Sequence, residues 1–522
     1  MIFRKNLAVI AALALVIAAP LMLRPKQDLL AGADRNLVIV TPHNEAIRHE
    51  FSRAFADYYF KKTGKHVRID WRTPGGTSEI ARYLASQYLG AFQNHWTGKL
   101  GHPWDAKVQF EFDNPKAGPD RPARKAFLES NVSCGIDLFF GGGSYDSMRQ
   151  AGAGRLVDCG IVKAHPELFN ESCIPQNRGG EAFWDAQGRW VGACLSTFGI
   201  CYNTDALQRL GIQTPPASWA DLGDPRYYGQ VAAANPTQSG SVAKAFEMMI
   251  QQQMLLRLSD AMPEPQAVNE GWTRGLRLIQ TMGANARYFT DSGTKIPWDV
   301  DSGDAAIGTC IDFYGRFQSE SVRKPDGSSR LQFLIPPGGS SVGADPVGLL
   351  RGAPNADVAR DFIEFVLSLE AQKLWNWKVG TPGGPEKYAL RRLPIRPELY
   401  ADQYSPLRSD PGVEPYKNDF VYHEEWTAPV FRGIGFIVRV MCIDSHDELR
   451  AAWRALIDAH FPPEATTVFH DVSIVDYEAA SGPIREKLQS AQKIEEVRLA
   501  KTLSDSFRAQ YRHAAELARA GK

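Results

Sequence analysis

The stretch LVIVTPHNEAIRHEFSRAFADYYFKKTGKHVRIDWRTPGGTSEIARYL, residues Leu37–Leu84, decides the fold. It opens with an apolar run, Leu37–Val40, that has the length of a buried strand. The apolar residues that follow recur every three or four positions, and this spacing predicts a helix that Gly64 ends. Val67–Trp71 alternates as a second strand. The order strand, helix, strand is a βαβ unit and predicts an α/β fold.

The second strand leads into a polar, glycine-rich turn, Thr73-Pro74-Gly75-Gly76-Thr77-Ser78-Glu79. The two glycines let the backbone approach a ligand closely. Thr77 or Ser78 can cap a helix whose free N–H groups and positive dipole end suit an anion. An ordinary turn with an ordinary cap explains the same residues, so the sequence leaves both interpretations open.

Two later turns have the same character. A buried strand from Cys134 to Phe140 runs into Gly141-Gly142-Gly143-Ser144, where an α/β sheet presents backbone amides to a ligand. A loop that only needs positive φ angles is the alternative. A short strand, Gln230–Ala234, is followed by the turn Asn235–Ser241, which opens another helix. Two helix N-termini that face each other would form a site for an anionic group.

Length and charge narrow the class of protein. A chain of 522 residues is too long for one compact core, so two or three domains are expected. The 59 basic and 59 acidic residues cancel, which argues against a nucleic-acid partner.

The N-terminus predicts export. Arg4 and Lys5 precede an uncharged apolar segment, Leu7–Leu23, which is the layout of a secretory signal. Ala31–Ala33 offers a cleavage site between small residues, and an uncleaved anchor remains open because 17 apolar residues nearly suffice to span a bilayer. We therefore expect a periplasmic or other extracytoplasmic protein. Its seven cysteines contain no C-x-x-C pair; Cys159 and Cys173 are free thiols or a disulfide.

The order of the segments predicts the domains. Residues 190–202 and 340–350 are long apolar stretches typical of crossings between two lobes, and residues 303–314 are interpreted as a strand that ends in Asp312-Phe313-Tyr314. The expected domains are a signal or anchor (1–33), lobe 1 (35–194 with 341–400, carrying an insertion at about 90–127), lobe 2 (195–340) and a partly helical C-terminal extension (401–522).

Several segments, in order, resemble one family. They are VIVTPHNE, GGTSEIARYL, IDLFFGGGSYD, YNTDAL with PPASWADLGDPRYYGQVAAANPTQSGS, GDAAIGTCIDFYG, and GLLRGAPNADVARDFIEFVLSLEAQKLW. Over Leu37–Ile395 the chain resembles the type II periplasmic solute-binding proteins of ABC importers, in the branch that binds ferric ion, thiamine, phosphonates and sugar phosphates. This resemblance implies a two-lobed α/β fold with hinge crossings, here followed by the helical extension.

The same resemblance implies a metal site in the iron-carrying relatives. A histidine after the first strand, a glutamate in the first ligand loop and two adjacent tyrosines hold the ion there. The matching positions are His43, Glu79 and the pair Phe313-Tyr314. One tyrosine is therefore replaced by phenylalanine, and a hard trivalent ion loses an anionic oxygen donor. Bound Fe³⁺ is thus one possible ligand, with His43, Glu79 and Tyr314 as its protein ligands, and an organic anion is the other. No resident cofactor is expected.

An organic anion such as a phosphonate, a phosphate ester or a carboxylate suits the polar residues better, because they offer hydroxyl and backbone donors. The predicted ligand-binding residues are Thr41, His43, Gly76, Thr77, Ser78, Glu79, Gly142, Gly143, Ser144, Ser196, Ser239, Gly240, Ser241, Asp312 and Tyr314.

The favoured hypothesis is a binding protein that closes on a small anionic solute and docks on an ABC permease in the inner membrane. A ferric-iron or thiamine carrier of the same family is the near alternative. An exported enzyme is a third reading, although no H-E-x-x-H or P-loop motif is present. The last is an anchored scaffold whose C-terminal extension binds a partner.

Overall fold

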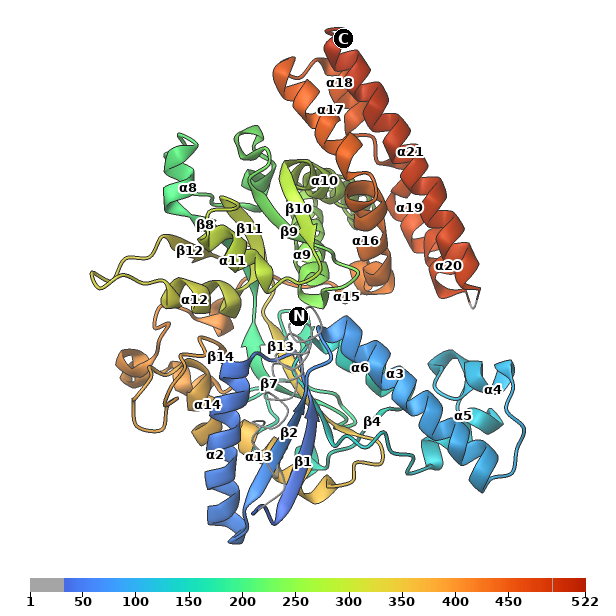
Figure 1. Cartoon of the computed structure of the whole chain (residues 1–522), viewed down its shortest axis with the longest axis vertical. Helices are drawn as coiled ribbons and strands as arrows, with labels where there is room; N and C mark the ends of the chain where they lie inside the picture. The colour runs from blue at the N-terminus through green and yellow to red at the C-terminus, as the bar shows by residue number, and fades with distance from the viewer. Residues whose placement is uncertain (1–31, 491) are drawn as a thin grey trace, which may run out of the picture.

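The structure is a computed structural model that describes residues 32–490 and 492–522. The predicted signal or anchor lies, apart from residues 32 and 33, outside the described residues. Figure 1 shows two α/β lobes, one mainly blue to cyan and the other green, and a group of orange and red helices beside the green lobe. The two-lobed α/β architecture predicted from the sequence is confirmed.

Lobe 1 is built on a seven-stranded sheet. Its strands are β1 (Arg35–Val40), β2 (Val67–Arg72), β3 (Leu138–Phe140), β4 (Leu156–Val157), β7 (Val191–Ser196), β13 (Gly343–Leu350) and β14 (Leu393–Pro394). They run in the order β14-β7-β13-β3-β1-β2, with β4 beside β13. β1 is parallel to β2 and β3, whereas β13 is antiparallel to β3 and β7.

Helices cover both faces of this sheet. They are α2 (Glu45–Thr63), α3 (Thr77–Asn94), η1 (His95–Lys99), α4 (Ala106–Glu111), η2 (Pro115–Ala117), α5 (Pro122–Glu129), α6 (Ser144–Ala153), α7 (Ile161–Ala164), α13 (Ala356–Leu367) and α14 (Leu369–Asn376), with a small β5 (Asn177–Arg178) and β6 (Glu181–Ala182) hairpin. Leu37 and Ile39 of β1 face the core under α2, while Val38 and Val40 face the core under α3. A strand buried on both faces explains the continuous apolar run.

Lobe 2 holds a five-stranded sheet in the order β10-β9-β11-β8-β12. The strands are β8 (Phe198–Asn203), β9 (Val231–Ala234), β10 (Ala286–Thr290), β11 (Ile307–Ile311) and β12 (Leu331–Leu334). The helices are α8 (Thr204–Arg209), η3 (Trp219–Gly223), η4 (Pro225–Tyr227), α9 (Gly240–Ser259), α10 (Glu264–Asn285), α11 (Lys295–Asp301) and α12 (Asp312–Ser321). In this lobe β9 is parallel to β10 and β11, and β8 is antiparallel to β11 and β12.

Two extended segments connect the lobes. The chain leaves the first sheet at the end of β7 and enters the second at the start of β8, with Thr197 between them. It returns between β12 and β13 through Ser340 and Ser341. The hydroxyl of Thr197 donates to the Ser340 hydroxyl at 2.9 Å, and the Phe198 amide donates to the same oxygen at 3.0 Å. The two crossings are therefore tied side by side, as a hinge requires.

The C-terminal extension first follows lobe 1 and then covers lobe 2. Its elements are η5 (Pro397–Tyr400), η6 (Asp402–Leu407), η7 (Pro415–Lys417), α15 (Glu424–Thr427), η8 (Ala428–Val430), α16 (Phe431–Val438), η9 (Arg439–Ile443), α17 (His446–Asp458), α18 (Pro463–Phe469), η10 (Ser473–Val475), α19 (Tyr477–Ala479), η11 (Ala480–Ile484), α20 (Arg485–Gln489) and α21 (Lys493–Arg519). In Figure 1 α17, α18 and α21 form a bundle at the end of lobe 2. The α21 helix buries Leu503, Phe507 and Tyr511.

One part of the extension is apolar enough to be mistaken for a membrane span. Among the described residues, only the run Glu424–Ile443 has the length and composition to cross a bilayer. It comprises α15, η8, α16 and η9, and 67% of its most apolar window is buried inside the molecule. Because α16 packs on α9, burial in the core accounts for this composition.

The structure differs from the sequence predictions at residues 303–314. The strand β11 ends at Ile311, and Asp312 begins α12 instead of ending the strand. An acidic residue is favoured in the first turn of a helix, which explains why the strand pattern stops there. Cys159 and Cys173 are free thiols, as are the other five cysteines.

A segment of the extension passes close to two glycines of lobe 1. The Tyr422 amide donates to the carbonyl oxygen of Gly179 at 2.8 Å. A Cβ atom on Gly180, whose φ is 78°, would overlap the carbonyl oxygen of Tyr422. Gly160 has nearly the same φ, 79°, but open space where its Cβ would lie.

These two glycines allow a matched test of that contact. Gly160→Ala should cost about 1–2 kcal/mol, the penalty for a left-handed residue with a side chain. Gly180→Ala should cost about 2 kcal/mol more. Its methyl group also displaces Tyr422, whose hydroxyl donates a buried hydrogen bond to a carboxylate. Chemical denaturation of both variants measures the difference. Equal losses would show that the segment around Tyr422 moves aside freely.

Candidate functional site

A cavity of about 440 Å³ lies between the lobes and gathers most of the predicted residues. Those that line it are His43, Gly76, Thr77, Glu79, Gly142, Gly143, Ser144, Ser196, Ser239, Gly240, Ser241 and Tyr314. Thr41, Ser78 and Asp312 are outside the lining. The cavity therefore collects residues from distant parts of the chain, from Pro42 to Phe431.

Lobe 1 contributes the first turns of α3 and α6 to the cavity wall. Gly76 and Gly143 occupy the N-cap positions, so the N-cap residue has no side chain that could cap either helix. The Gly76 amide donates to Glu79 Oε2 at 2.9 Å. Gly142 has a φ of 90°, and a Cβ there would lie 2.5 Å from Cγ2 of Thr77. Glycine is thus required where the two helix starts converge.

Lobe 2 contributes the first turn of α9. Ser239 is its N-cap residue, but its hydroxyl pairs with that of Ser241 at 3.2 Å and does not cap the helix. A Cβ on Gly240 would lie 2.5 Å from Oγ1 of Thr77, and one on Gly76 would lie 3.5 Å from the carbonyl oxygen of Gln238. The two turns therefore face each other across the cleft in direct contact.

A carboxyl group lies at the point where these helix starts meet. Asp146, in the first turn of α6, lines the cavity, and its Oδ2 is 3.4 Å from the Cβ position of Gly240. Burial raises the pKa of Asp146, while a hydrogen bond from Thr77 and the charge of Arg149 oppose this. A carboxyl group at this position is favoured by the positive helix ends that meet there.

Lys244, one turn into α9, supplies a cation to the cavity wall. Its ammonium lies 3.0 Å from Glu181 of lobe 1 and 2.9 Å from Glu247, and 3.6 Å above the ring of Tyr422. Burial alone would lower the pKa of Lys244, but the two carboxylates raise it, so the amine stays charged. Glu247 also accepts hydrogen bonds from Tyr422 and Thr427, at 2.9 and 2.6 Å.

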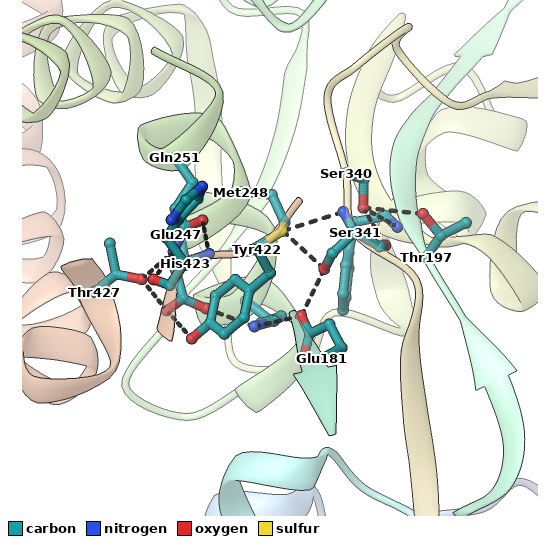
Figure 2. Close-up of polar contacts among 12 residues, drawn as sticks. Glu181, Thr197, Glu247, Met248, Gln251, Ser340, Ser341, Tyr422, His423 and Thr427 are labelled. Atoms are coloured by element: carbon teal, nitrogen blue, oxygen red, sulfur yellow. Dashed lines mark hydrogen bonds and ion pairs between the residues drawn. The ribbon is translucent and has the colours of Figure 1, made fainter. Parts of the chain in front are cut away.

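Figure 2 shows that this network joins four parts of the protein. Ser341, in the returning crossing, donates to Glu181 at 2.6 Å. Gln251 of α9 donates to the His423 carbonyl and the Thr427 hydroxyl, at 2.8 and 2.7 Å. Lobe 1, the hinge, lobe 2 and the extension therefore share one polar cluster beside the cavity.

The opposite wall contains a fully buried arginine. Arg392 donates to Asp345 and, at 3.0 Å, to Nε2 of His43, and its guanidinium lies 4.0 Å from the ring centre of Phe313. Ser196 donates to the same aspartate at 2.9 Å. Burial and the neighbouring Arg392 charge hold the pKa of His43 well below its usual range, so the imidazole is neutral. Arg392 and Phe313 belong to different lobes, so their stacking also spans the cleft.

The residues predicted for ferric iron are engaged elsewhere. Nε2 of His43 accepts a hydrogen bond from Arg392, and Glu79 accepts one from Gly76. Burial raises the pKa of Tyr314 to about 12, which disfavours a phenolate. In residues 32–490 and 492–522, no three His, Cys, Asp or Glu side chains group as a metal site. A metal would have to displace these contacts.

Two of the three predicted residues outside the lining, Thr41 and Asp312, have structural partners. Thr41 donates to the Phe140 carbonyl at 2.6 Å and accepts from the His43 amide at 3.1 Å, so it positions the histidine loop. Asp312 lies 3.3 Å from Arg316, and burial raises its pKa to about 6 although Arg316 opposes the shift. Ser78 follows Thr77 on α3 but does not reach the cavity.

Sequence reasoning missed the charged and aromatic part of the lining. Lys244 and Glu181 belong to no recognisable motif. Arg392 lies in a run of basic residues that looks like an ordinary surface segment. For Lys244 a weak signal exists, because Lys244 and Glu247 are the only charges in the otherwise apolar start of α9. The missed lining residues include Asp146, Glu181, Gln238, Lys244, Asp291, Asp345, Arg392 and Phe431.

The neutral state of His43 predicts a pH dependence of stability. Its pKa in the folded protein lies below the value of about 6.5 for an unfolded chain, so below that pH the unfolded chain binds a proton that the folded protein does not. Stability must then fall as pH falls. Between pH 6.5 and 5.5, denaturation curves should show wild type losing roughly 1 kcal/mol more than His43→Gln.

The exposed His66 provides the control. His66→Gln should lose stability over this pH range as wild type does. The assignment of a neutral His43 fails if His43→Gln and wild type show the same loss.

Comparisons with known proteins place this chain among binding proteins. It is 25% identical over 276 residues to an uncharacterized protein of Haemophilus influenzae, which is 53% of this chain and 65% of that one. It is 27% identical over 184 residues to the phosphoglycerate transport regulatory protein PgtC of Salmonella typhimurium, 35% of this chain and 40% of the relative. The chain thus matches less than two thirds of the length of either relative.

Solved structures of periplasmic proteins align with most of the chain. The binding protein AfuA of Actinobacillus pleuropneumoniae, with fructose-6-phosphate bound, aligns at 16% identity and a TM-score of 0.49, covering 81% of this chain and 98% of its own. Iron-bound HitA of Pseudomonas aeruginosa aligns at 16% identity and a TM-score of 0.45, covering 77% and 99%.

The decisive comparison is with a family model. The model of the bacterial extracellular solute-binding proteins matches residues 132–394, half of the chain, from β3 to β14. This range contains α6, α9, Lys244, Arg392 and both crossings. The chain therefore belongs to the bacterial extracellular solute-binding protein family.

Proposed function

We propose that this protein captures a small anionic solute between its lobes in the periplasm and delivers it to an ABC permease. One observation carries the proposal: the first turns of α3 and α6 from lobe 1 and of α9 from lobe 2 open onto one cavity without a side-chain cap. Each helix start carries about half a positive elementary charge and unpaired N–H groups. Together they form a site for an anion such as a phosphate or carboxylate.

The carboxylates of the lining do not cancel this preference, because most have partners of their own. Glu181 and Glu247 pair with Lys244, and Asp345 pairs with Arg392. Glu79 accepts the Gly76 amide and so offsets part of the field at the start of α3. The starts of α6 and α9 remain to attract an anion toward the cavity.

Capture by closure follows from the position of the hinge. The tied crossings at Thr197 and Ser340 lie at one side of the cavity, while the contact between Gly240 and Thr77 lies across the cleft. Rotation about the crossings would separate α9 from α3 and expose the site to solvent. A solute that bridges the two helix starts would favour the closed form, because only there do both lobes contact it. This mechanism needs no chemical step, so we propose a binding protein and not an enzyme.

The binding test uses inorganic phosphate, a phosphoglycerate, methylphosphonate, succinate and Fe³⁺ as probes; the phosphoglycerate is suggested by the name of the Salmonella relative. At least one organic or inorganic anion should raise the melting temperature of wild type and give a one-to-one calorimetric titration, with the anion unchanged afterwards. Saturation at one hundred times Kd should add about 2.7 kcal/mol of stability. Equimolar Fe³⁺ binding with a tyrosinate-to-iron colour would instead favour the ferric alternative.

A glycine variant tests which loop contacts the anion. Gly142→Val places a branched side chain against Thr77, where the starts of α3 and α6 converge, and should reduce affinity at least tenfold. Gly135→Val is the control, because Gly135 also has a positive φ, 73°, but has open space around its Cβ position. Unchanged affinity in Gly142→Val would remove this loop from the site.

A second variant tests closure. Gly240→Ala inserts a methyl group 2.5 Å from Oγ1 of Thr77, at a residue without a positive φ, so the lobes should be pushed apart with little backbone strain. Small-angle X-ray scattering should then give a larger radius of gyration than wild type, and the anion should bind more weakly. A scattering curve identical to wild type would show that the two helix starts do not limit closure.

A further inference from the structure

The family match ends at residue 394, but the cavity does not end with it. Phe431, the first residue of α16 in the C-terminal extension, is part of the lining. We infer that the C-terminal extension forms a third wall of the solute site, and that Phe431 closes the cavity against Tyr145 of lobe 1 and limits the size of the solute. The inference rests on the proposed function, because it assigns the extension a part in the same site.

The contact between the two rings is direct. The ring centres of Phe431 and Tyr145 are 4.3 Å apart, and the rings are tilted by 47°. Tyr145 is the second residue of α6 and also lines the cavity, so its ring sits next to the helix start that would hold the anion. Burial raises the pKa of Tyr145, as expected for a phenol covered by another ring. Such tilted aromatic pairs stabilise a contact beyond the effect of their buried area.

Phe431 is held by lobe 2, although its partner belongs to lobe 1. Ile434 and Ile437 of α16 are buried in the core shared with α9, and Gly435 lies close enough to Pro236 that its Cβ would be 3.5 Å from that carbonyl oxygen. The start of α16 must therefore move with α9 when the lobes separate. The aromatic contact breaks on opening and forms on closing.

Two other contacts of the extension cross the cleft in the same direction. Lys116 of the lobe 1 insertion donates to Gln489, at the end of α20, at 2.5 Å. Near the hinge, Tyr422 lies under the ammonium of Lys244, which itself pairs with Glu181 of lobe 1. The extension thus contacts lobe 1 at the hinge, at the cavity and at the outer edge, which is the arrangement of a wall and not of an appended domain.

The aromatic wall has a consequence for selectivity. The anionic group would lie at the starts of α3, α6 and α9, and the opposite part of the solute would meet Phe431 and Tyr145. Side chains that fill a fixed volume reject larger solutes by steric overlap. Shortening Phe431 should then admit bulkier anions while weakening the retention of small ones.

The experiment compares Phe431→Ala, Phe431→Leu and the control Phe461→Ala. Phe461 packs on Trp453 in the same extension and is not in the cavity lining. The probes are a phosphoglycerate and a bulkier hexose phosphate. Dissociation of the phosphoglycerate should be at least tenfold faster from Phe431→Ala, and the affinity ratio of hexose phosphate to phosphoglycerate should rise at least tenfold. Phe461→Ala should match wild type in both quantities.

Hydrogen exchange gives a readout that needs no solute. Peptides covering residues 144–153 should take up deuterium faster in Phe431→Ala than in wild type, and unchanged in Phe461→Ala. Phe431→Leu keeps most of the apolar volume on α16, so it serves if the alanine variant fails to fold, and it should show the same changes to a smaller degree.

The outcomes separate the two proposals. If wild type binds the phosphoglycerate and all three variants release it at the same rate, the third wall is refuted while the proposed function stands. If wild type binds neither phosphate ester nor any other anion of the panel, the proposed function fails, and this inference fails with it.

Discussion

The arrangement of this site depends on a contact that should be unfavourable by itself. The starts of α3, α6 and α9 converge, and each brings a positive dipole end into the same small volume. Nothing in the hydrophobic core compensates for this. Asp146 lies among the three helix starts, and Glu79 accepts the Gly76 amide at the start of α3, so both carboxyl groups offset part of this charge. Any further group that balances these helix ends, whether a side chain or a bound solute, would favour the closed arrangement of the lobes.

The polar cluster around Lys244 serves the same closure in a different way. Glu181 of lobe 1 and Glu247 of lobe 2 share one ammonium, and Tyr422 and Thr427 of the extension satisfy the second carboxylate. A buried charge without a partner costs several kcal/mol, so the cluster favours the one geometry in which all partners are present. The cluster lies next to Ser341, in the returning crossing. The geometry that it favours is therefore set at the hinge, where a small rotation moves the whole of lobe 2.

The sequence predicts features that depend on residues close together in the chain and misses those that depend on distant residues. The βαβ unit, the crossings and the glycine turns are local patterns. Together with the family resemblance they predicted the fold class and 12 of the 32 residues that line the cavity. Lys244, Arg392 and Phe431 enter the cavity through contacts with residues far away in the chain, which no local period reveals. Asp312 shows the opposite error: its polar character was visible, but burial beside Arg316 beneath the wall was not.

The contact with Arg392 explains why position 313 holds a phenylalanine and not a tyrosine. A phenolate at this position would be drawn to the buried guanidinium, whose face lies 4.0 Å from the ring centre, and the pair would compete with Asp345 for the same charge. A phenyl ring accepts the cation on its face and leaves the ion pair with Asp345 intact. The arginine in turn occupies Nε2 of His43. Arg392 thus joins Asp345, His43 and the ring of Phe313 in one buried cluster that connects the two lobes.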